Sequence, residues 1–134
     1  MIKRFYPSSE GFLLDLVDKE DLFGYVFSGF AEVTIDGVKC YVSYNKPGAD
    51  LLIIRGTPEV EEVLRAKVEG QNNLSAFTKL YAKFAVIRAH YQDTEEAWKR
   101  VKAELEKEEF KETLENYSVT IATLINKMFP GFDA

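Results

Sequence analysis

The dipeptide Asp36-Gly37 lies between two segments rich in apolar and β-branched residues, and it constrains the fold more than any other feature of the sequence. An Asp-Gly pair tolerates the positive φ angles of a two-residue type I′ turn, so residues 25–35 and 38–44 are predicted to form an antiparallel hairpin. The register implied by this turn places three pairs on one apolar face: Ile35 with Val38, Val33 with Cys40, and Ala31 with Val42. The opposite face mixes charged, polar and aromatic residues, so we expect it to be partly exposed to solvent.

Two further segments predict strands on either side of this hairpin. Residues 11–17 alternate apolar and polar side chains, with Phe12, Leu14 and Leu16 at every second position. Residues 51–54 follow a turn cluster and form a short continuous apolar run, which is typical of a strand buried on both faces. Four strands joined by short connections indicate an antiparallel meander whose apolar face needs a cover.

The chemistry of the sequence changes at Thr57-Pro58, where a capping residue and a proline at the first helical position predict the start of a helix. Helical spacing continues in a second segment that reaches Tyr91 and in a third that follows Asp93. A fourth pattern begins at Phe110 in a different phase, so a kink or short break is expected within residues 106–109.

Together these elements predict an α+β fold: an N-terminal four-stranded antiparallel meander followed by three to four C-terminal amphipathic helices. Residues 1–134 are expected to form a single domain, because the chain is long enough for one core and shows no linker or repeat. Within it, residues 1–56 make the β-rich part and residues 57–134 the helical part.

The composition is that of a globular chain. Of its 134 residues, 46% are hydrophobic and 29% are charged, and no apolar run is long enough to span a bilayer. We therefore expect a cytoplasmic protein without membrane contact. Lys and Glu are frequent while Gln is rare, a bias that resembles thermophile composition. The net charge of −5 has the wrong sign for attracting nucleic acid through the overall field of the protein.

The chain has one cysteine, Cys40, and one histidine, His90, which together cannot supply a zinc site of thiolate and imidazole ligands. His90 precedes Asp93, Glu95 and Glu96, the residue types that a metal or an acid–base pair would need, but capping of two adjacent helices explains all four. Cys40 falls on the apolar face of the hairpin, which favours a buried small hydrophobe over a nucleophile. We predict no cofactor and no metal.

The most regular pattern lies near the C-terminus, where apolar residues recur at spacings of four and three, as in the seam of a coiled coil. The six seam residues are Phe110, Leu114, Tyr117, Ile121, Leu124 and Met128. A four-stranded sheet needs only about two helices over one face, so an apolar helical surface should remain for a second subunit. We therefore predict a homodimer through this seam, the alternative being that the seam covers the sheet.

A second hypothesis is a small-molecule binder or enzyme with an aromatic pocket between the sheet and the second helix. The polar tips of its wall would come from Tyr25, Tyr41, Tyr44, Tyr81, Arg88 and His90. A third is a weak nucleic-acid binder that uses a local basic strip, although most such strips are solvated helix faces. The strip consists of Arg65, Lys67, Lys79, Lys83 and Arg88.

One histidine and one cysteine leave little for nucleophilic or metal-thiolate chemistry, whereas carboxylate chemistry stays open. The sequence therefore favours a non-catalytic interaction, regulatory or assembly module over an enzyme. A protein partner, in the first place a second copy of the chain, is the partner we expect, and nucleic acid is not.

Overall fold

The computed structural model describes residues 11–35, 37–46, 50–71 and 73–132. The chain forms two compact units, Met1–Leu74 and Ser75–Ala134. The sequence predicts the change from β-rich to helical chain at residue 57, but the first α-helix belongs with the strands, because its apolar side is buried against the sheet. We refer to these parts as the first unit and the second unit.

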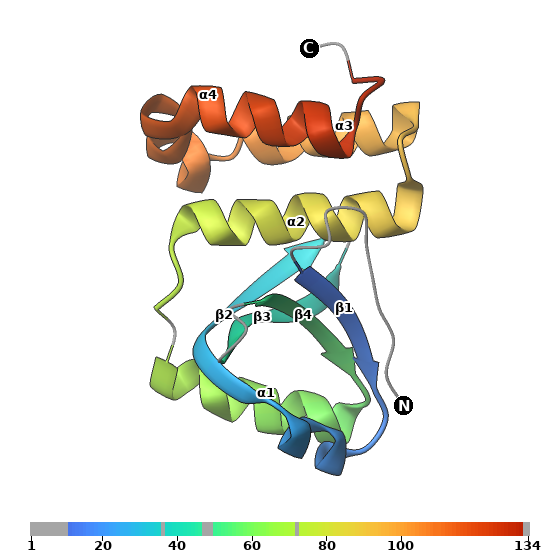
Figure 1. Ribbon diagram of the computed structural model, residues 1–134, viewed down its shortest axis with the longest axis vertical. Helices are drawn as coiled ribbons and strands as arrows, with labels where there is room; N and C mark the ends of the chain where they lie inside the picture. The colour runs from blue at the N-terminus through green and yellow to red at the C-terminus, as the bar shows by residue number, and fades with distance from the viewer. Residues whose placement is uncertain (1–10, 36, 47–49, 72, 133–134) are drawn as a thin grey trace. The chain divides into compact units, whose positions relative to one another are not determined.

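The first unit is built on a sheet with the strand order β1-β4-β3-β2 (Figure 1). Its strands are β1 (Gly11–Leu16), β2 (Val26–Ile35), β3 (Val38–Lys46) and β4 (Asp50–Gly56). β2, β3 and β4 form a three-stranded antiparallel sheet, which is the part of the predicted meander that the structure confirms.

The hairpin of β2 and β3 has the predicted register. Gly37 has a φ of 77°, the left-handed conformation that the turn requires, and Asp36 lies outside the described residues. The register shifts between Ser28 and Ala31, a bulge at which Gly29 has a φ of 78°. Beyond the turn, the three predicted pairs are present: Ile35 with Val38, Val33 with Cys40, and Ala31 with Val42.

The prediction that the first strand also joins the sheet antiparallel is wrong. β1 pairs with β4 in parallel, with Leu16 opposite Gly56. Between β1 and β2 the chain forms a short 3-10 helix, η1 (Lys19–Gly24), rather than a hairpin turn. Because strands that run in the same direction need a crossover, this segment carries the chain across one face and leaves β1 and β2 at opposite edges.

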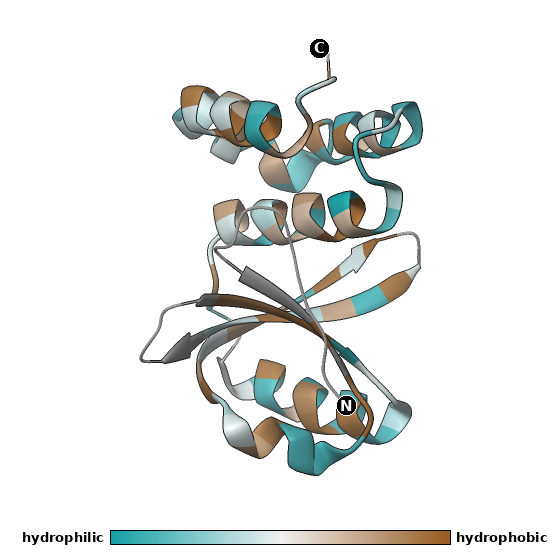
Figure 2. Cartoon of the chain, turned by 45° about the vertical axis from the view of Figure 1, so that its right-hand side comes forward, coloured by the Kyte–Doolittle hydropathy of each residue, from teal (hydrophilic) through white to brown (hydrophobic). Residues whose placement is uncertain are grey.

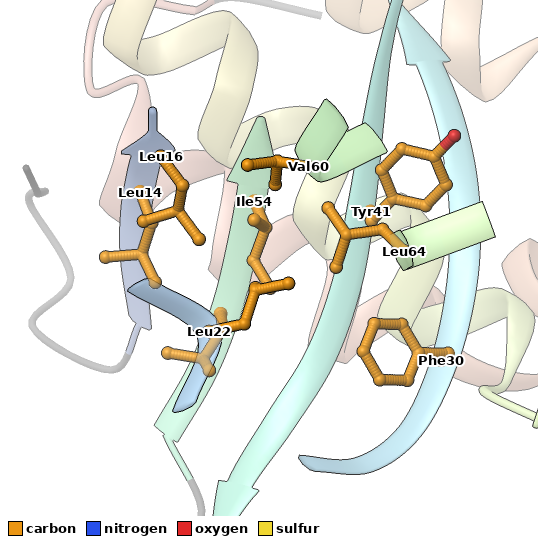
Figure 3. Close-up of a cluster of buried hydrophobic side chains, with 9 residues drawn as sticks. Leu14, Leu16, Leu22, Phe30, Tyr41, Ile54, Val60 and Leu64 are labelled. Carbon is orange, nitrogen blue, oxygen red and sulfur yellow. The ribbon is translucent and has the colours of Figure 1, made fainter. Parts of the chain in front are cut away.

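The helix α1 (Pro58–Gln71) covers one face of the sheet and begins at the predicted proline. Phe30 and Tyr41 are buried there, so the hairpin face that the sequence predicts to be mixed and wet is largely core, with Glu32 and Lys39 exposed at its edge. The core of this face contains nine buried residues (Figure 3): Leu14, Leu16, Leu22, Phe30, Tyr41, Leu52, Ile54, Val60 and Leu64.

The turn from β4 to α1 is tied to the end of β1. The Thr57 N–H donates to the Leu16 carbonyl at 3.2 Å, and the Thr57 hydroxyl donates to the Val17 carbonyl at 2.9 Å. Thr57 was expected to cap the helix with this hydroxyl. Its side chain instead joins two segments that are 40 residues apart in the sequence.

The elements of the second unit, in the part of it that the structure describes, are all helices: α2 (Ala76–Tyr91), α3 (Glu95–Leu105), the 3-10 helix η2 (Glu108–Phe110) and α4 (Lys111–Met128). α3 and α4 each pack against α2 (Figure 1). Figure 2 shows hydrophobic and hydrophilic residues alternating along the helices, as in amphipathic helices. The predicted break within residues 106–109 is confirmed, since α3 ends before it and η2 spans its far side.

The N-terminal caps of these helices follow the expected chemistry. The Thr94 hydroxyl accepts from the Ala97 N–H at 3.3 Å and so caps α3, the helix predicted to follow Asp93. The cap of α2 is Ser75, which accepts from the Thr78 N–H at 3.2 Å. The sequence predicts Asn72-Asn73 for that role; Asn72 lies outside the described residues, and the Asn73 N–H donates to the Phe30 carbonyl in the first unit.

Candidate functional site

The predicted C-terminal seam is divided between the interior and the surface of the second unit. Leu114 and Leu124 are half-buried, and Tyr117 is 52% exposed. The backbone at Tyr117 leaves the helical conformation, with φ −131° and ψ 31°, so the phase of the buried stripe changes there, and Ile125 is buried in place of Leu124. Three seam residues are buried within the chain: Phe110, Ile121 and Met128. The homodimer interface through this seam stays a prediction.

Beyond this kink, α4 presents an exposed surface without charge. The sequence between Glu115 and Lys127 contains no charged residue, and Val119 is 78% exposed. The Thr123 hydroxyl donates to the Val119 carbonyl at 2.9 Å, so another surface can cover it without leaving this donor unpaired. The exposed residues of this segment are Ser118, Val119, Thr120, Ala122, Thr123 and Asn126. We call them the neutral face of α4.

The residues predicted to form an aromatic pocket belong to both units. In the first, Tyr41 and Tyr44 are three positions apart on β3, which places them on opposite faces of the sheet. Tyr41 is buried in the core against α1 and Tyr44 is half-buried. Tyr25 follows η1 directly and is half-buried. The pocket stays a prediction.

The other three pocket residues belong to α2 in the second unit. Tyr81 is half-buried and His90 is exposed. The Arg88 Nε donates to the Met128 carbonyl at 2.8 Å, which fastens the end of α4 to α2. The guanidinium therefore has a structural partner within the unit.

Of the acidic residues after His90, Glu95 and Glu96 lie in the first turn of α3, where Glu96 pairs with Arg100, and Asp93 holds the C-terminal turn. The two carboxylate oxygens of Asp93 accept from the Trp98 Nε1 at 2.6 Å and from the Gly131 N–H at 2.8 Å. Within the described parts of the chain, no group of three or more His, Cys, Asp or Glu residues is arranged to hold a metal ion. Cys40 is buried opposite Val33, in the predicted position.

Three cations of the predicted basic strip are paired with groups of the chain itself. The Lys83 Nζ lies 2.7 Å from the Glu104 Oε1, and both side chains are buried. The Arg65 Nη2 lies 3.0 Å from the Glu61 Oε1, and Arg88 holds the Met128 carbonyl. These pairings reduce the positive charge that the strip offers to a polyanion.

Sequence reasoning missed a depression of about 270 Å³ between η1 and α1 in the first unit. It opens onto a wider and shallower surface depression of about 530 Å³, which shares Lys19, Val63 and Lys67 with it and also includes Glu59, Glu62 and Ala66. The signal was present in the apolar and aromatic residues that directly follow the turn Asp18–Asp21, but the residues of α1 that complete the wall are 40 positions away. The depression is lined by Lys19, Leu22, Phe23, Tyr25, Phe27, Val63 and Lys67.

Local hydrogen bonds hold η1 in the conformation that forms this wall. The Asp21 carboxylate accepts from the N–H groups of Val17 and Asp18, both at 3.3 Å, which closes the first turn. Burial, and in addition the Asp21 carboxylate, raise the pKa of Tyr25 above its usual value. The Tyr25 phenol is therefore neutral at physiological pH and keeps its proton for donation.

The sequence matches no known family profile, no curated protein and no solved structure. Among the helices of the described residues, none combines the length and the apolar composition that crossing a membrane requires.

Proposed function

We propose that this protein is a non-catalytic assembly module that associates with a second copy of itself through the neutral face of α4. The single observation that carries the proposal is that face: a run of exposed helical residues without charge in a chain of which 29% of the residues are charged. Surfaces that stay in water carry both signs of charge, whereas the centres of protein interfaces are depleted in charged residues.

The size of the residues supports a helix–helix contact. Ser118, Ala122 and Thr123 are small, so a second helix can approach the backbone of α4 closely. A two-fold pair would bring the same face of each copy together, since such an interface is self-complementary. Val119 would then contact the partner's copy of the same helix near the axis.

The area available predicts a weak dimer. α4 has 18 residues, and one face of it is smaller than the roughly 800 Å² per partner of a standard stable interface. We therefore expect an equilibrium between monomer and dimer. A cytoplasmic setting is part of the proposal and is supported by the single, buried cysteine.

Light scattering after size exclusion over a wide concentration range tests the proposal. The wild-type mass should rise with concentration toward that of a dimer, and Val119→Glu should stay a monomer because it places two carboxylates near the axis. The matched control is Ala103→Glu, which adds the same charge at an exposed position of α3 and should dimerise as the wild type does. Circular dichroism should show equal folding of all three proteins.

Two results would contradict the proposal: a wild-type mass that stays monomeric at every concentration, or a Val119→Glu protein that dimerises as the wild type does. Val119 suits this test better than Ile121, because Ile121 is buried and its replacement by Glu would unfold the protein for reasons unrelated to association.

A further inference from the structure

The depression between η1 and α1 has an apolar wall that the fold leaves open to solvent. Leu22 lies in the core at its base, and Phe27 and Val63 are half-buried against that core. Phe23, on the rim, is 80% exposed. A large aromatic side chain with this exposure gains little from folding, so its apolar surface is available to a ligand.

The charged side chains that line this depression are both cationic, Lys19 and Lys67. The Lys67 Nζ lies 5.6 Å from the centre of the Phe27 ring, which holds the ammonium group at the apolar wall. Among the described residues, no carboxylate lies within ion-pair distance of either lysine. The charges beside the apolar wall that are not ion-paired are therefore positive.

Three acidic residues lie near enough to compete with an anionic ligand for the two lysines. Their positions decide whether the depression favours an anion or a cation. Glu59 and Glu62 line the shallower neighbouring surface, outside the depression itself. Asp21 is engaged with the N–H groups of Val17 and Asp18. Tyr25 also lines the depression, and its neutral phenol is able to donate a hydrogen bond.

We propose that this depression binds a small amphiphilic carboxylate, with its alkyl or aryl chain on the wall formed by Leu22, Phe27 and Val63 and its carboxylate at Lys19 and Lys67. The volume of about 270 Å³ is slightly below the roughly 300 Å³ at which pockets for drug-sized ligands begin, so the ligand is short. This inference concerns the first unit and is independent of self-association through α4.

The test compares three probes with the same eight-carbon chain and different head groups: octanoate, octanol and octylamine. Binding to the full chain is followed by the NMR shifts of its methyl and aromatic groups. Octanoate should cause saturable shifts at Leu22, Phe27 and Val63, and it should bind about tenfold more tightly than octanol, because the neutral head lacks the attraction to two ammonium groups. Octylamine should bind more weakly than octanol.

Two substitutions separate the charged and apolar parts of the site. Lys67→Gln should reduce octanoate binding toward that of octanol and leave octanol binding unchanged, while Lys67→Arg should retain the preference. Phe23→Ser should weaken octanoate and octanol by the same factor. The matched control is Lys102→Gln on α3, an exposed lysine of the second unit, which should change nothing.

The inference is overturned if no probe gives saturable shifts, or if the octanoate shifts lie away from these residues. It is also overturned if octanol binds as tightly as octanoate, or if Lys67→Gln retains the preference for the anion. Raising the ionic strength from about 0.05 M to about 0.5 M should weaken octanoate binding alone, since salt screens the lysines and strengthens apolar burial.

Discussion

The Nζ atom of Lys83 lies 2.7 Å from the Oε1 atom of Glu104, and the two side chains are only 6% and 8% exposed. This ion pair joins α2 to α3 inside the second unit. Each partner has a further ion-pair contact: the Glu104 Oε2 is 3.0 Å from the Lys107 Nζ, and the Lys83 Nζ is 3.8 Å from the Glu109 Oε1. The buried charges are thus compensated by a small network across α2, α3 and η2.

Removing one member of this pair should cost much more than removing both. Glu104→Leu leaves the buried Lys83 with only the more exposed Glu109 carboxylate at 3.8 Å, and should lower the free energy of unfolding by about 3 kcal/mol. The double change Lys83→Met/Glu104→Leu should recover most of that loss, because no buried charge remains. Urea unfolding followed by the fluorescence of Trp98, the only tryptophan, measures both. Equal losses in the single and double variants would contradict this account.

Tyr41→Phe should stabilise the first unit at neutral pH. The Tyr41 hydroxyl is buried and makes no well-aligned hydrogen bond with the described residues, although the Arg65 guanidinium lies near it, so its removal relieves a desolvation cost. We expect a gain of about 1 kcal/mol in the free energy of unfolding. Tyr44→Phe is the matched control on the same strand, since Tyr44 is only half-buried and removal of its hydroxyl should relieve a smaller desolvation cost. Urea midpoints by circular dichroism decide between them.

The stability of the protein should fall as the pH rises above about 10. Burial, and then the Glu32 and Glu61 carboxylates, raise the pKa of Tyr41 above its ordinary value of 10.0, so the folded state holds this proton more tightly than the unfolded state does. Stability from such a group is complete below the unfolded pKa and is lost as the pH rises through the folded pKa. Tyr41→Phe should reduce the slope of urea midpoint against pH in this range.

The decrease of the urea midpoint with rising pH should not vanish in the Tyr41→Phe protein, because two other groups act in the same direction. A hydrogen bond to Glu104 raises the pKa of Lys107 above 10.5, and burial raises that of Tyr25. A midpoint that rises with pH in the alkaline range would contradict the sign of all three shifts.

Gly29→Ala should destabilise the protein by about 1 to 2 kcal/mol, because a Cβ there combines strained backbone with a contact that the ends of two side chains must move to relieve. Gly29 has a φ of +78°, and its Cβ would lie 2.8 Å from the Asn73 Oδ1 and 2.9 Å from the Leu74 Cδ2. Gly37→Ala is the control for the strain alone, since its φ is +77° and nothing lies within 4 Å. Thermal unfolding should rank the wild type first, Gly37→Ala second and Gly29→Ala last. If the two variants lose equal stability, the clash contributes nothing.

The features that the sequence predicts correctly depend on neighbouring residues. The Asp-Gly turn sets the register of β2 and β3, and Pro58 and Thr94 mark where α1 and α3 begin. Each of these signals acts within a few residues through φ angles or capping hydrogen bonds, so it can be recognised in the sequence without knowledge of the fold.

The features that it misses depend on contacts between distant segments. Lys83 has the residue type of a solvated helix face, and its burial follows from a carboxylate 21 residues later. The candidate ligand site likewise combines η1 with residues of α1 about 40 positions away. No periodicity in the sequence encodes which distant segment supplies the partner.

The sequence by itself determined the hairpin, the starts of α1 and α3 and the α+β class, because turn chemistry, capping and apolar periodicity are local properties. The tertiary structure alone decided that β1 joins β4 in parallel, that α1 buries Tyr41, and that Phe23 stays exposed beside Lys19 and Lys67. These outcomes depend on which apolar surfaces cover one another, a choice made by the burial of the whole chain rather than by any one segment.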